Sequence, residues 1–248
     1  MSDKKPLLGV LGGLGPMSTF YFCELLTAHT RASSDADHID MIVSSRASTP
    51  DRTAWILGRS DQDPLPVMLE EAHRLERAGA DLLVIPCNTA HFFYDGIAAG
   101  CRIPVLNIIR ETVAHLCENG VRRFGLLATE GTVFSGAYRR VCEEYGVVCE
   151  VPTEAEQRIV SSVIYDEIKQ NRPVHMEAFL SVADALLSRG SERLVLGCTE
   201  LSLLKKRLPE GERYLDSLEA LAFATIRACK KTPVGFPADF LQGRETGR

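Results

Sequence analysis

The sequence predicts an α/β fold of two pseudo-symmetric domains, with parallel sheets flanked by helices and an active-site cleft between the domains. Short apolar runs alternate along the 248 residues with amphipathic stretches of helical period. The apolar runs are too continuous to alternate between buried and exposed positions, which is typical of parallel strands covered on both faces. An internal repeat indicates that this pattern occurs twice.

The expected elements alternate along the chain. The expected strands are Leu7–Leu11, Ile39–Ser44, Leu82–Ile85, Pro104–Leu106, Phe124–Ala128 and Leu194–Leu196. The expected helices are Met17–Arg31, Val67–Ala78, Gly131–Tyr145, Val174–Arg189 and Ser217–Lys230. Residues 231–248 then carry Pro233, Pro237 and three glycines, and we expect a loosely ordered tail there.

The repeat becomes visible when the chain is slid onto itself so that Cys87 meets Cys198. In each copy a helix ends at a glycine, a buried strand follows, and a cysteine stands where the strand ends. The aligned pairs include Leu75 with Leu186, Gly79 with Gly190, and Leu83 with Leu194. We therefore expect one half at 1–117 and another at 118–212, with 213–230 packing back on the first. One continuous sheet is the alternative.

The composition argues against several classes of protein. The net charge of -5 comes with no long run of one sign, so we expect neither nucleic acid nor a membrane as a partner. No apolar stretch approaches the roughly 18 residues that span a bilayer. The apolar run after Lys4 and Lys5 is broken by glycines, so we expect a strand rather than a signal peptide, and a cytoplasmic protein. The eight cysteines form no CxxC pair and no cluster with zinc-ligand spacing, so we expect no metal.

Cys87 and Cys198 stand where chemistry is expected in such a fold. Ligands of parallel α/β units bind beyond the carboxyl ends of the strands, where loops lead into helix N-termini. Such an N-terminus is expected to lower the pKa of a nearby thiol and to bind carboxylates. Two such thiols facing one cleft, one ionised and one protonated, suit proton transfer at both faces of a tetrahedral carbon. A pair of buried structural cysteines and a redox pair are the alternatives.

Four segments resemble the aspartate/glutamate racemase superfamily, and its aspartate racemase branch in particular. They are GVLGGLGPMST (Gly9–Thr19), PDRTAWILG (Pro50–Gly58), IPCNTAHFFYDGI (Ile85–Ile97) and LGCTELSLL (Leu196–Leu204). The resemblance runs from about Leu7 to Lys230. It implies two similar α/β halves with one catalytic cysteine from each, and no pyridoxal phosphate or other cofactor. The glycine turn before Pro16 and the Glu200 that follows the second cysteine are typical of the aspartate branch.

The resemblance also implies roles for individual residues. Cys87 and Cys198 match the catalytic pair. Positions that match binding sites for the substrate's α-carboxylate are Asn88, Thr89 and Thr199. Arg52 matches an arginine that recognises an acidic side chain, and Lys169 looks like the lysine that accompanies it. The stretch Ser44–Thr49 departs from the family pattern, because it lacks an asparagine near its start.

Four further residues allow two interpretations each. Gly12 and Gly13 lack the full dinucleotide-binding spacing, and form either a turn that lets substrate approach the backbone or a plain strand–helix turn. His91 either tunes the thiol of Cys87 or is satisfied by local hydrogen bonds. Glu200 either caps its helix or orients the second cysteine. Weaker candidates for lining the cleft are Thr129, Thr132 and Tyr165.

The sequence therefore predicts a cofactor-independent amino-acid racemase with a two-thiol mechanism. An acidic amino acid, aspartate in first place, is the expected small-molecule substrate, and a homodimer is the expected assembly. The alternatives are a racemase of broad or glutamate-type specificity, a non-catalytic amino-acid-binding relative, and a thiol redox protein.

Overall fold

Two parallel sheets with the same strand order form the frame of the protein, for which a computed structural model describes residues 5–209 and 213–242. The first sheet has the order β2-β1-β3-β4, and the second β6-β5-β7-β8. The strands of the first are Leu8–Gly12 (β1), Met41–Ser45 (β2), Leu82–Val84 (β3) and Val105–Leu106 (β4). Those of the second are Arg123–Leu127 (β5), Val148–Glu150 (β6), Arg193–Leu196 (β7) and Tyr214–Asp216 (β8). The predicted fold class is confirmed.

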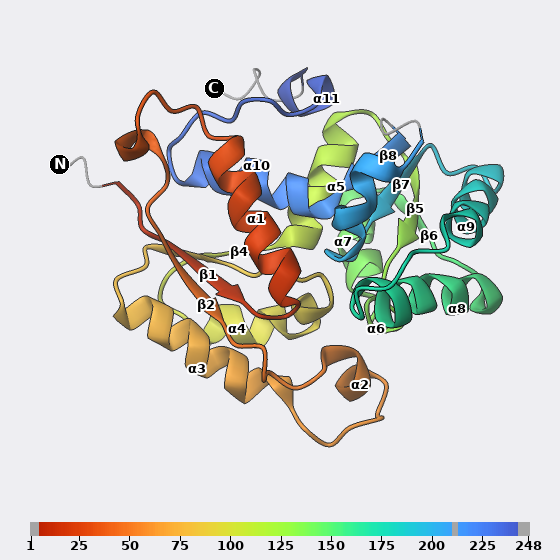
Figure 1. Cartoon of the computed structure of the whole chain (residues 1–248), viewed down its shortest axis with the longest axis horizontal. Coiled ribbons are helices and arrows are strands. Elements are labelled where there is room, and N and C mark those ends of the chain that lie inside the picture. Colours follow the sequence, from red (N-terminus) through yellow and green to blue (C-terminus); the bar gives the residue numbers. More distant parts are fainter. Residues whose placement is uncertain (1–4, 210–212, 243–248) are drawn as a thin grey trace.

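Helices flank both sheets (Figure 1). Those up to residue 118 are Pro16–Ala28 (α1), Arg52–Ile56 (α2), Pro64–Arg77 (α3), Tyr94–Gly100 (α4), Ile108–Glu118 (α5) and the 3₁₀ helices Asp35–Asp37 (η1) and Thr89–Phe93 (η2). Later ones are Glu130–Phe134 (α6), Ala137–Tyr145 (α7), Glu154–Ser162 (α8), Met176–Ser188 (α9), Ser217–Ala228 (α10) and Ala238–Gln242 (α11), with the π-helix Val163–Ile168 (η3) and the 3₁₀ helix Leu201–Arg207 (η4). Within the described residues, no helix is long and apolar enough to cross a membrane.

The leucines of the sequence repeat make the same packing contact in both halves. Leu83 in β3 pairs with Gly9 in β1, and Leu194 in β7 pairs with Gly125 in β5. A Cβ atom at Gly9 would lie 2.5 Å from Leu83 Cδ2, and one at Gly125 would lie 2.7 Å from Leu194 Cδ2. Each half therefore packs a repeated leucine onto a bare glycine of the neighbouring strand.

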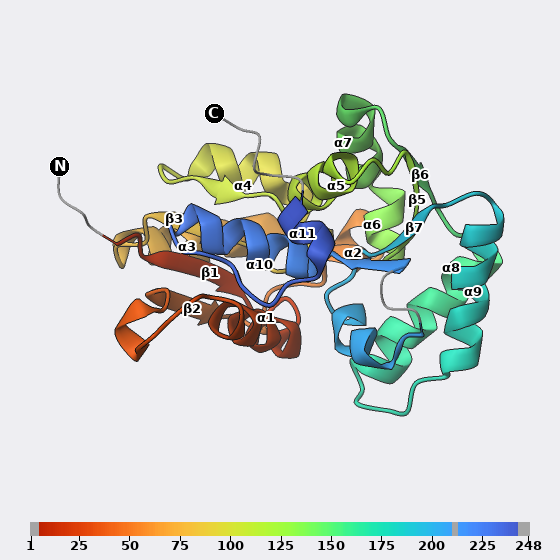
Figure 2. The same cartoon turned by 90° about the horizontal axis from the view of Figure 1, so that it is seen from above.

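One continuous hydrophobic core joins the two halves. It contains Leu8 and Phe22 from the first half, Phe124 and Tyr138 from the second, and Leu221 from α10. Helix α10 packs against α1 and α5. Seen from above, α10 and α11 lie in the middle, between the outer elements of both halves (Figure 2). The strand just before α10 differs from the expectation, because β8 pairs with β7 in the second sheet.

One predicted helix is divided in the structure. We expected a single helix over Gly131–Tyr145, but α6 ends before Gly136 and α7 begins after it. Gly136 has a φ of 65°, in the left-handed region that glycine adopts without strain and that ends helices.

The C-terminal segment packs onto the core, contrary to the expectation of a loosely ordered tail. Phe236 and Phe240 are buried, and both rings contact Phe223 of α10. Asp239 binds Arg193 of β7 with an N–O distance of 2.5 Å. The last part of the expected tail, 243–248, lies outside the described residues.

We expect the Asp239 contact to stabilise the fold in a pH-dependent way. The imidazole of His115, whose Nε2 lies 3.7 Å from Asp239 Oδ2, and the guanidinium of Arg193 together lower the pKa of Asp239 to about 2 despite partial burial. Because an unfolded aspartate has a pKa of about 3.9, this stabilisation is present above about pH 4 and is lost as the pH falls from about 4 to 2. Asp239→Asn should lower the free energy of unfolding at pH 7 by about 1 kcal/mol, allowing for solvent screening.

Urea unfolding at pH 7, 5, 4 and 3 measures this difference, which should shrink at the lowest pH. The matched control is Asp184→Asn, which removes an exposed carboxylate from α9. An equal loss in both variants, or a loss at Asp239 that is independent of pH, would contradict the prediction.

Candidate active site

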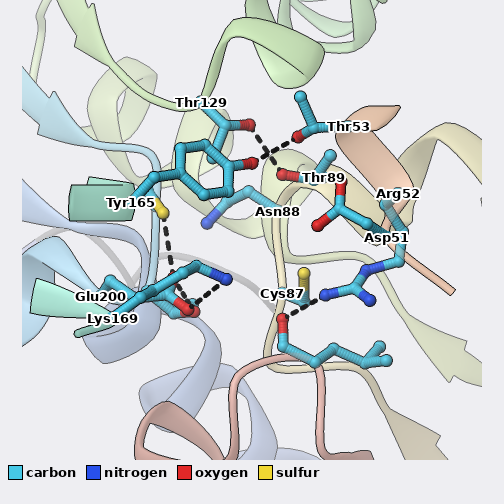
Figure 3. A pocket seen from close by; sticks show the side chains of 13 residues that line it. Asp51, Arg52, Thr53, Cys87, Asn88, Thr89, Thr129, Tyr165, Lys169 and Glu200 are labelled. Carbon is cyan, nitrogen blue, oxygen red and sulfur yellow. Dashed lines mark hydrogen bonds and ion pairs between the residues drawn. The ribbon is translucent and has the colours of Figure 1, made fainter. Parts of the chain in front are cut away.

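A cavity between the halves collects residues that follow the carboxyl ends of six strands. Its lining residues are Leu14, Asp51, Arg52, Thr53, Cys87, Asn88, Thr89, Thr129, Tyr165, Lys169, Cys198, Thr199 and Glu200. They come from the segments after β1, β2 and β3 in one half and after β5, β6 and β7 in the other. The corresponding edges of the two sheets therefore face each other across one site, as the topology of parallel α/β units favours (Figure 3).

The two cysteines of the sequence repeat both line this cavity. Cys87 follows β3 and Cys198 follows β7, the corresponding strands of the two sheets. Both side chains are buried, with 6% and 4% of their surface exposed. In Figure 3, Cys87 lies between Arg52 on one side and the Lys169–Glu200 pair on the other.

Burial reverses the expected ionisation of the thiols. We expected helix N-termini to lower the pKa of both cysteines. Burial instead raises the pKa of Cys87, although the charge of Arg52 and the N–H of Ala90 act against it. The pKa of Cys198 is raised well above its usual range by burial and by the carboxylate of Glu200. The helices that follow the two cysteines are 3₁₀ helices, with poorer hydrogen-bond geometry than an α-helix.

Glu200 contacts the second cysteine rather than capping its helix. Its Oε2 accepts a hydrogen bond from Cys198 Sγ at 3.0 Å, and its Oε1 lies 3.1 Å from Lys169 Nζ. Its side chain makes no capping hydrogen bond to η4. Burial opposes the charge of Lys169, but Glu200 and the two thiols outweigh it and raise the pKa of Lys169. Of the two interpretations of Glu200, the structure supports the one in which it orients the cysteine.

His91 holds the backbone of Cys87 and not its thiol. Nε2 accepts a hydrogen bond from the Ile108 N–H at 3.2 Å, so the proton sits on Nδ1, which donates to the carbonyl of Cys87 at 2.8 Å. Burial lowers the pKa of His91 to about 4, which keeps the ring neutral near pH 7. The interpretation of a histidine satisfied by local hydrogen bonds therefore fits.

Asn88 and Thr89 are held in place by hydrogen bonds to the second half and to the first residue of α10. Asn88 donates to Ser217 Oγ at 2.9 Å and accepts from the Tyr138 hydroxyl at 2.7 Å. The hydroxyl of Thr89 lies 2.8 Å from that of Thr129 and 2.9 Å from that of Thr132. These bonds fix both residues at the cavity, where Thr199 is also buried.

Arg52 uses most of its donors on the backbone. Its guanidinium donates to the carbonyls of Leu14, Thr49 and Pro50 at 2.8, 3.2 and 2.9 Å. Nε is buried without a hydrogen-bond partner among the described residues. Of the five N–H donors of an arginine, three therefore hold the loops around the site, and two have no partner among the described residues.

Gly12 and Gly13 do not line the cavity. Gly13 has a φ of 84°, and a Cβ atom there would lie 2.4 Å from the backbone nitrogen of Arg46. A Cβ atom at Gly12 would lie 2.3 Å from Thr19 Cγ2. These contacts favour the plain strand–helix turn over a backbone approached by substrate, and the lining residue of this turn is Leu14.

The cavity is narrow in this structure. Tyr165, in the π-helix η3, donates a hydrogen bond to Thr53 Oγ1 of the other half at 2.7 Å. Thr53 and Tyr165 both line the cavity, whose volume is only about 10 Å³, close to that of one water molecule. A second cavity of about 750 Å³ shares Asp51, Thr53 and Tyr165 with the first. A ligand larger than water therefore needs the lining of the cavity to move apart.

Three lining residues escaped the sequence analysis, namely Leu14, Asp51 and Thr53. Asp51 and Thr53 flank Arg52 in the motif PDRT, which was the available signal for them. Asp51 also accepts a hydrogen bond from the Ala54 N–H at 2.7 Å and caps α2. Within residues 5–209 and 213–242, no three His, Cys, Asp or Glu side chains are arranged to hold a metal ion.

Comparisons with known proteins agree with this architecture. The profile of the Asp/Glu/hydantoin racemase family matches residues 11–225. The chain is 27% identical to the broad specificity amino-acid racemase RacX of Bacillus subtilis, over 89% of this chain and 96% of RacX. It superposes on Picrophilus torridus aspartate racemase with a TM-score of 0.81 at 29% identity, over 92% of this chain and 96% of that one. The fold also matches that of Francisella tularensis glutamate racemase, with a TM-score of 0.63 at 18% identity, over 96% of this chain and 91% of that one.

Proposed function

The chain belongs to the Asp/Glu/hydantoin racemase family, and we propose that it racemises an acidic amino acid, aspartate in first place, with Cys87 and Cys198 as the catalytic pair. One observation carries the proposal: the two cysteines come from corresponding strands of the two halves and line the same narrow cavity. Inversion at the α-carbon needs one proton-transferring group on each face of the substrate. Two thiols contributed by opposite halves meet that need.

In the proposed reaction, the thiolate of one cysteine removes the α-proton and becomes a thiol. The carbanion left behind takes a proton on its opposite face from the second cysteine, which becomes a thiolate. Protons balance within the step, and the reverse reaction uses the same groups in exchanged roles. No cofactor enters this scheme.

The carbanion has to be stabilised by the cavity itself. We assign the α-carboxylate to Asn88, Thr89 and Thr199, at the starts of η2 and η4, where first-turn N–H groups lack partners inside the helix. A narrow cavity strengthens these interactions, because it excludes water from the charge that develops. The fixed hydroxyls and amides need little reorganisation as that charge forms.

We assign the side-chain carboxylate of the substrate to Arg52 and Lys169. Arg52 has an Nε–H without a partner among the described residues. The Lys169 ammonium has three N–H donors, so it can contact a substrate carboxylate while it keeps Glu200. The likeness to RacX supports the second candidate, a broad-specificity racemase, because so much of each chain is matched. The family resemblance underlies our further proposals of a cytoplasmic homodimer and of a boundary between the halves near residue 117.

Proton NMR in deuterated buffer tests the function directly. We expect aspartate to lose its α-proton signal as its optical activity decays, and glutamate, alanine, serine and homoserine to react more slowly. Activity should survive dialysis against a strong chelator, and the protein should show no visible absorbance from a bound aldehyde cofactor. Faster turnover of a neutral amino acid would favour the broad-specificity racemase. Binding of amino acids without any exchange would favour a non-catalytic relative.

A further inference from the structure

Three partners share the buried carboxylate of Glu200, one of which is the Thr199 hydroxyl, 3.4 Å from Oε2. One oxygen accepts the S–H of Cys198 at 3.0 Å, and the other lies 3.1 Å from the ammonium of Lys169. Only 6% of the Glu200 surface is exposed, so water screens neither contact well. A dashed line in Figure 3 joins the carboxylate of Glu200 to the ammonium of Lys169. A carboxylate in this position favours the protonated form of the thiol that donates to it.

The opposite half leaves room for this carboxylate. A Cβ atom at Gly15 would lie only 2.4 Å from Glu200 Oε1. The φ of Gly15 is −125°, which any residue adopts, so the backbone conformation does not require glycine there. The reason for glycine is therefore steric, since a side chain at position 15 would push Glu200 away.

Cys87 has different neighbours. The charge of Arg52 and the N–H of Ala90 both favour its thiolate. Glu200 also acts on Cys87, but without a hydrogen bond between the two side chains. The two thiols match in the fold and differ in their electrostatic surroundings: one lies beside a cation, and the other beside a carboxylate.

We propose that Glu200 is a positioning residue that holds Cys198 as a thiol in the resting enzyme, so that Cys87 is the base and Cys198 the proton donor for the first substrate molecule. This inference rests on the proposed two-thiol function. After the donor step, Cys198 is a thiolate beside a carboxylate, with Lys169 as the cation that balances the pair. To restore the resting state, Cys198 regains a proton, either from the solvent or from the α-carbon of the opposite enantiomer. Cys87 gives up the proton that it had removed from the substrate.

Several charged or titratable groups line the cavity together with Cys198. Those that line the cavity with it are Glu200 on its own loop, Tyr165 and Lys169 at the π-helix, and Asp51, Arg52 and Cys87 in the other half. Of these, Glu200 accepts the hydrogen bond from its thiol. Replacing Glu200 by glutamine keeps the shape and removes the charge, which isolates the electrostatic effect.

The pH dependence of iodoacetamide alkylation, followed at each cysteine by peptide mass spectrometry, tests the inference. In the wild type, we expect the midpoint for Cys87 to lie below that for Cys198. Glu200→Gln should lower the midpoint of Cys198 by about one pH unit or more, and that of Cys87 by less. Both thiols become accessible by the same opening of the cavity, so midpoints are compared and not absolute rates.

Two further variants make the test specific. Gly15→Ala keeps every charge but displaces the carboxylate, and should lower the Cys198 midpoint in the same direction. Glu130→Gln removes a carboxylate that pairs with Arg59 at the surface, and should leave both midpoints unchanged. Circular dichroism checks the fold of each variant.

Two results would overturn the inference: a Cys198 that ionises at or below the pH of Cys87 in the wild type, or a Cys198 midpoint that Glu200→Gln leaves unchanged. Alkylation needs no substrate and no turnover. The midpoints therefore test Glu200 even if the protein racemises nothing, and the NMR assay tests the proposed function separately.

Discussion

Replacing Cys87 by serine should abolish racemisation in both directions, and Cys198→Ser should do the same. We expect a loss of at least about a thousandfold, toward the upper end of what a positioned acid–base group contributes. A serine hydroxyl ionises far less readily than a thiol, so it can serve neither as base nor as proton donor to a carbanion. Loss of optical activity from each aspartate enantiomer, followed by circular dichroism, measures the effect.

The single-cysteine variants should differ in one respect. With Cys198 replaced, the remaining thiolate can still remove and return a proton on its own face. In deuterated buffer, we expect slow deuterium incorporation into one enantiomer, without inversion. Cys101→Ser is the matched control, because Cys101 is partly buried and does not line the cavity. Near-wild-type racemisation by either Cys87→Ser or Cys198→Ser would rule out the two-thiol mechanism.

Replacing Arg52 by alanine should remove the preference for an acidic side chain. We expect the ratio of kcat/KM for aspartate to kcat/KM for asparagine to fall about a hundredfold, because a lost charge-assisted contact of this kind costs about 2–5 kcal/mol. Asparagine is the matched substrate, since it has nearly the shape of aspartate without the charge. The measurement is the initial rate of racemisation of both substrates, by wild type and variant.

The ratio is needed because Arg52 also has structural contacts. It holds the carbonyls of Leu14, Thr49 and Pro50, and its charge acts on Cys87. Losses through these contacts affect all substrates alike and cancel in the ratio. An equal fall in kcat/KM for aspartate and asparagine would show that Arg52 shapes the site without recognising the side chain of the substrate.

The central strands and the repeat were predictable because their signals are local. The apolar runs around Leu8, Leu83 and Leu194 mark buried strands, and the cysteine after each repeated strand marks the edge where ligands bind. The edge strands β6 and β8 were missed. They have only three residues each, and Val148 in β6 is 45% exposed, so neither presents a long apolar run.

Contacts between distant segments could not be predicted from one sequence. The Lys169–Glu200 pair joins the π-helix to the loop after β7, and no local pattern specifies such a pairing. The predicted lowering of the pKa of both thiols was also wrong, because the structure raises both values. Helix N-termini are visible as capping residues, whereas the depth of burial that outweighs them depends on the complete packing of both halves.

Thermodynamics limits how far the unequal surroundings of Cys87 and Cys198 can affect the two directions of the reaction. Two enantiomers have the same free energy in solution, so the equilibrium constant of a racemisation is one, and kcat/KM has to be the same for both directions. Stabilising one protonation arrangement over the other therefore cannot make the enzyme favour one enantiomer as product. It can only change kcat and KM in the same proportion. The enantiomer for which both constants are lower is then the tighter-bound and more slowly converted of the two.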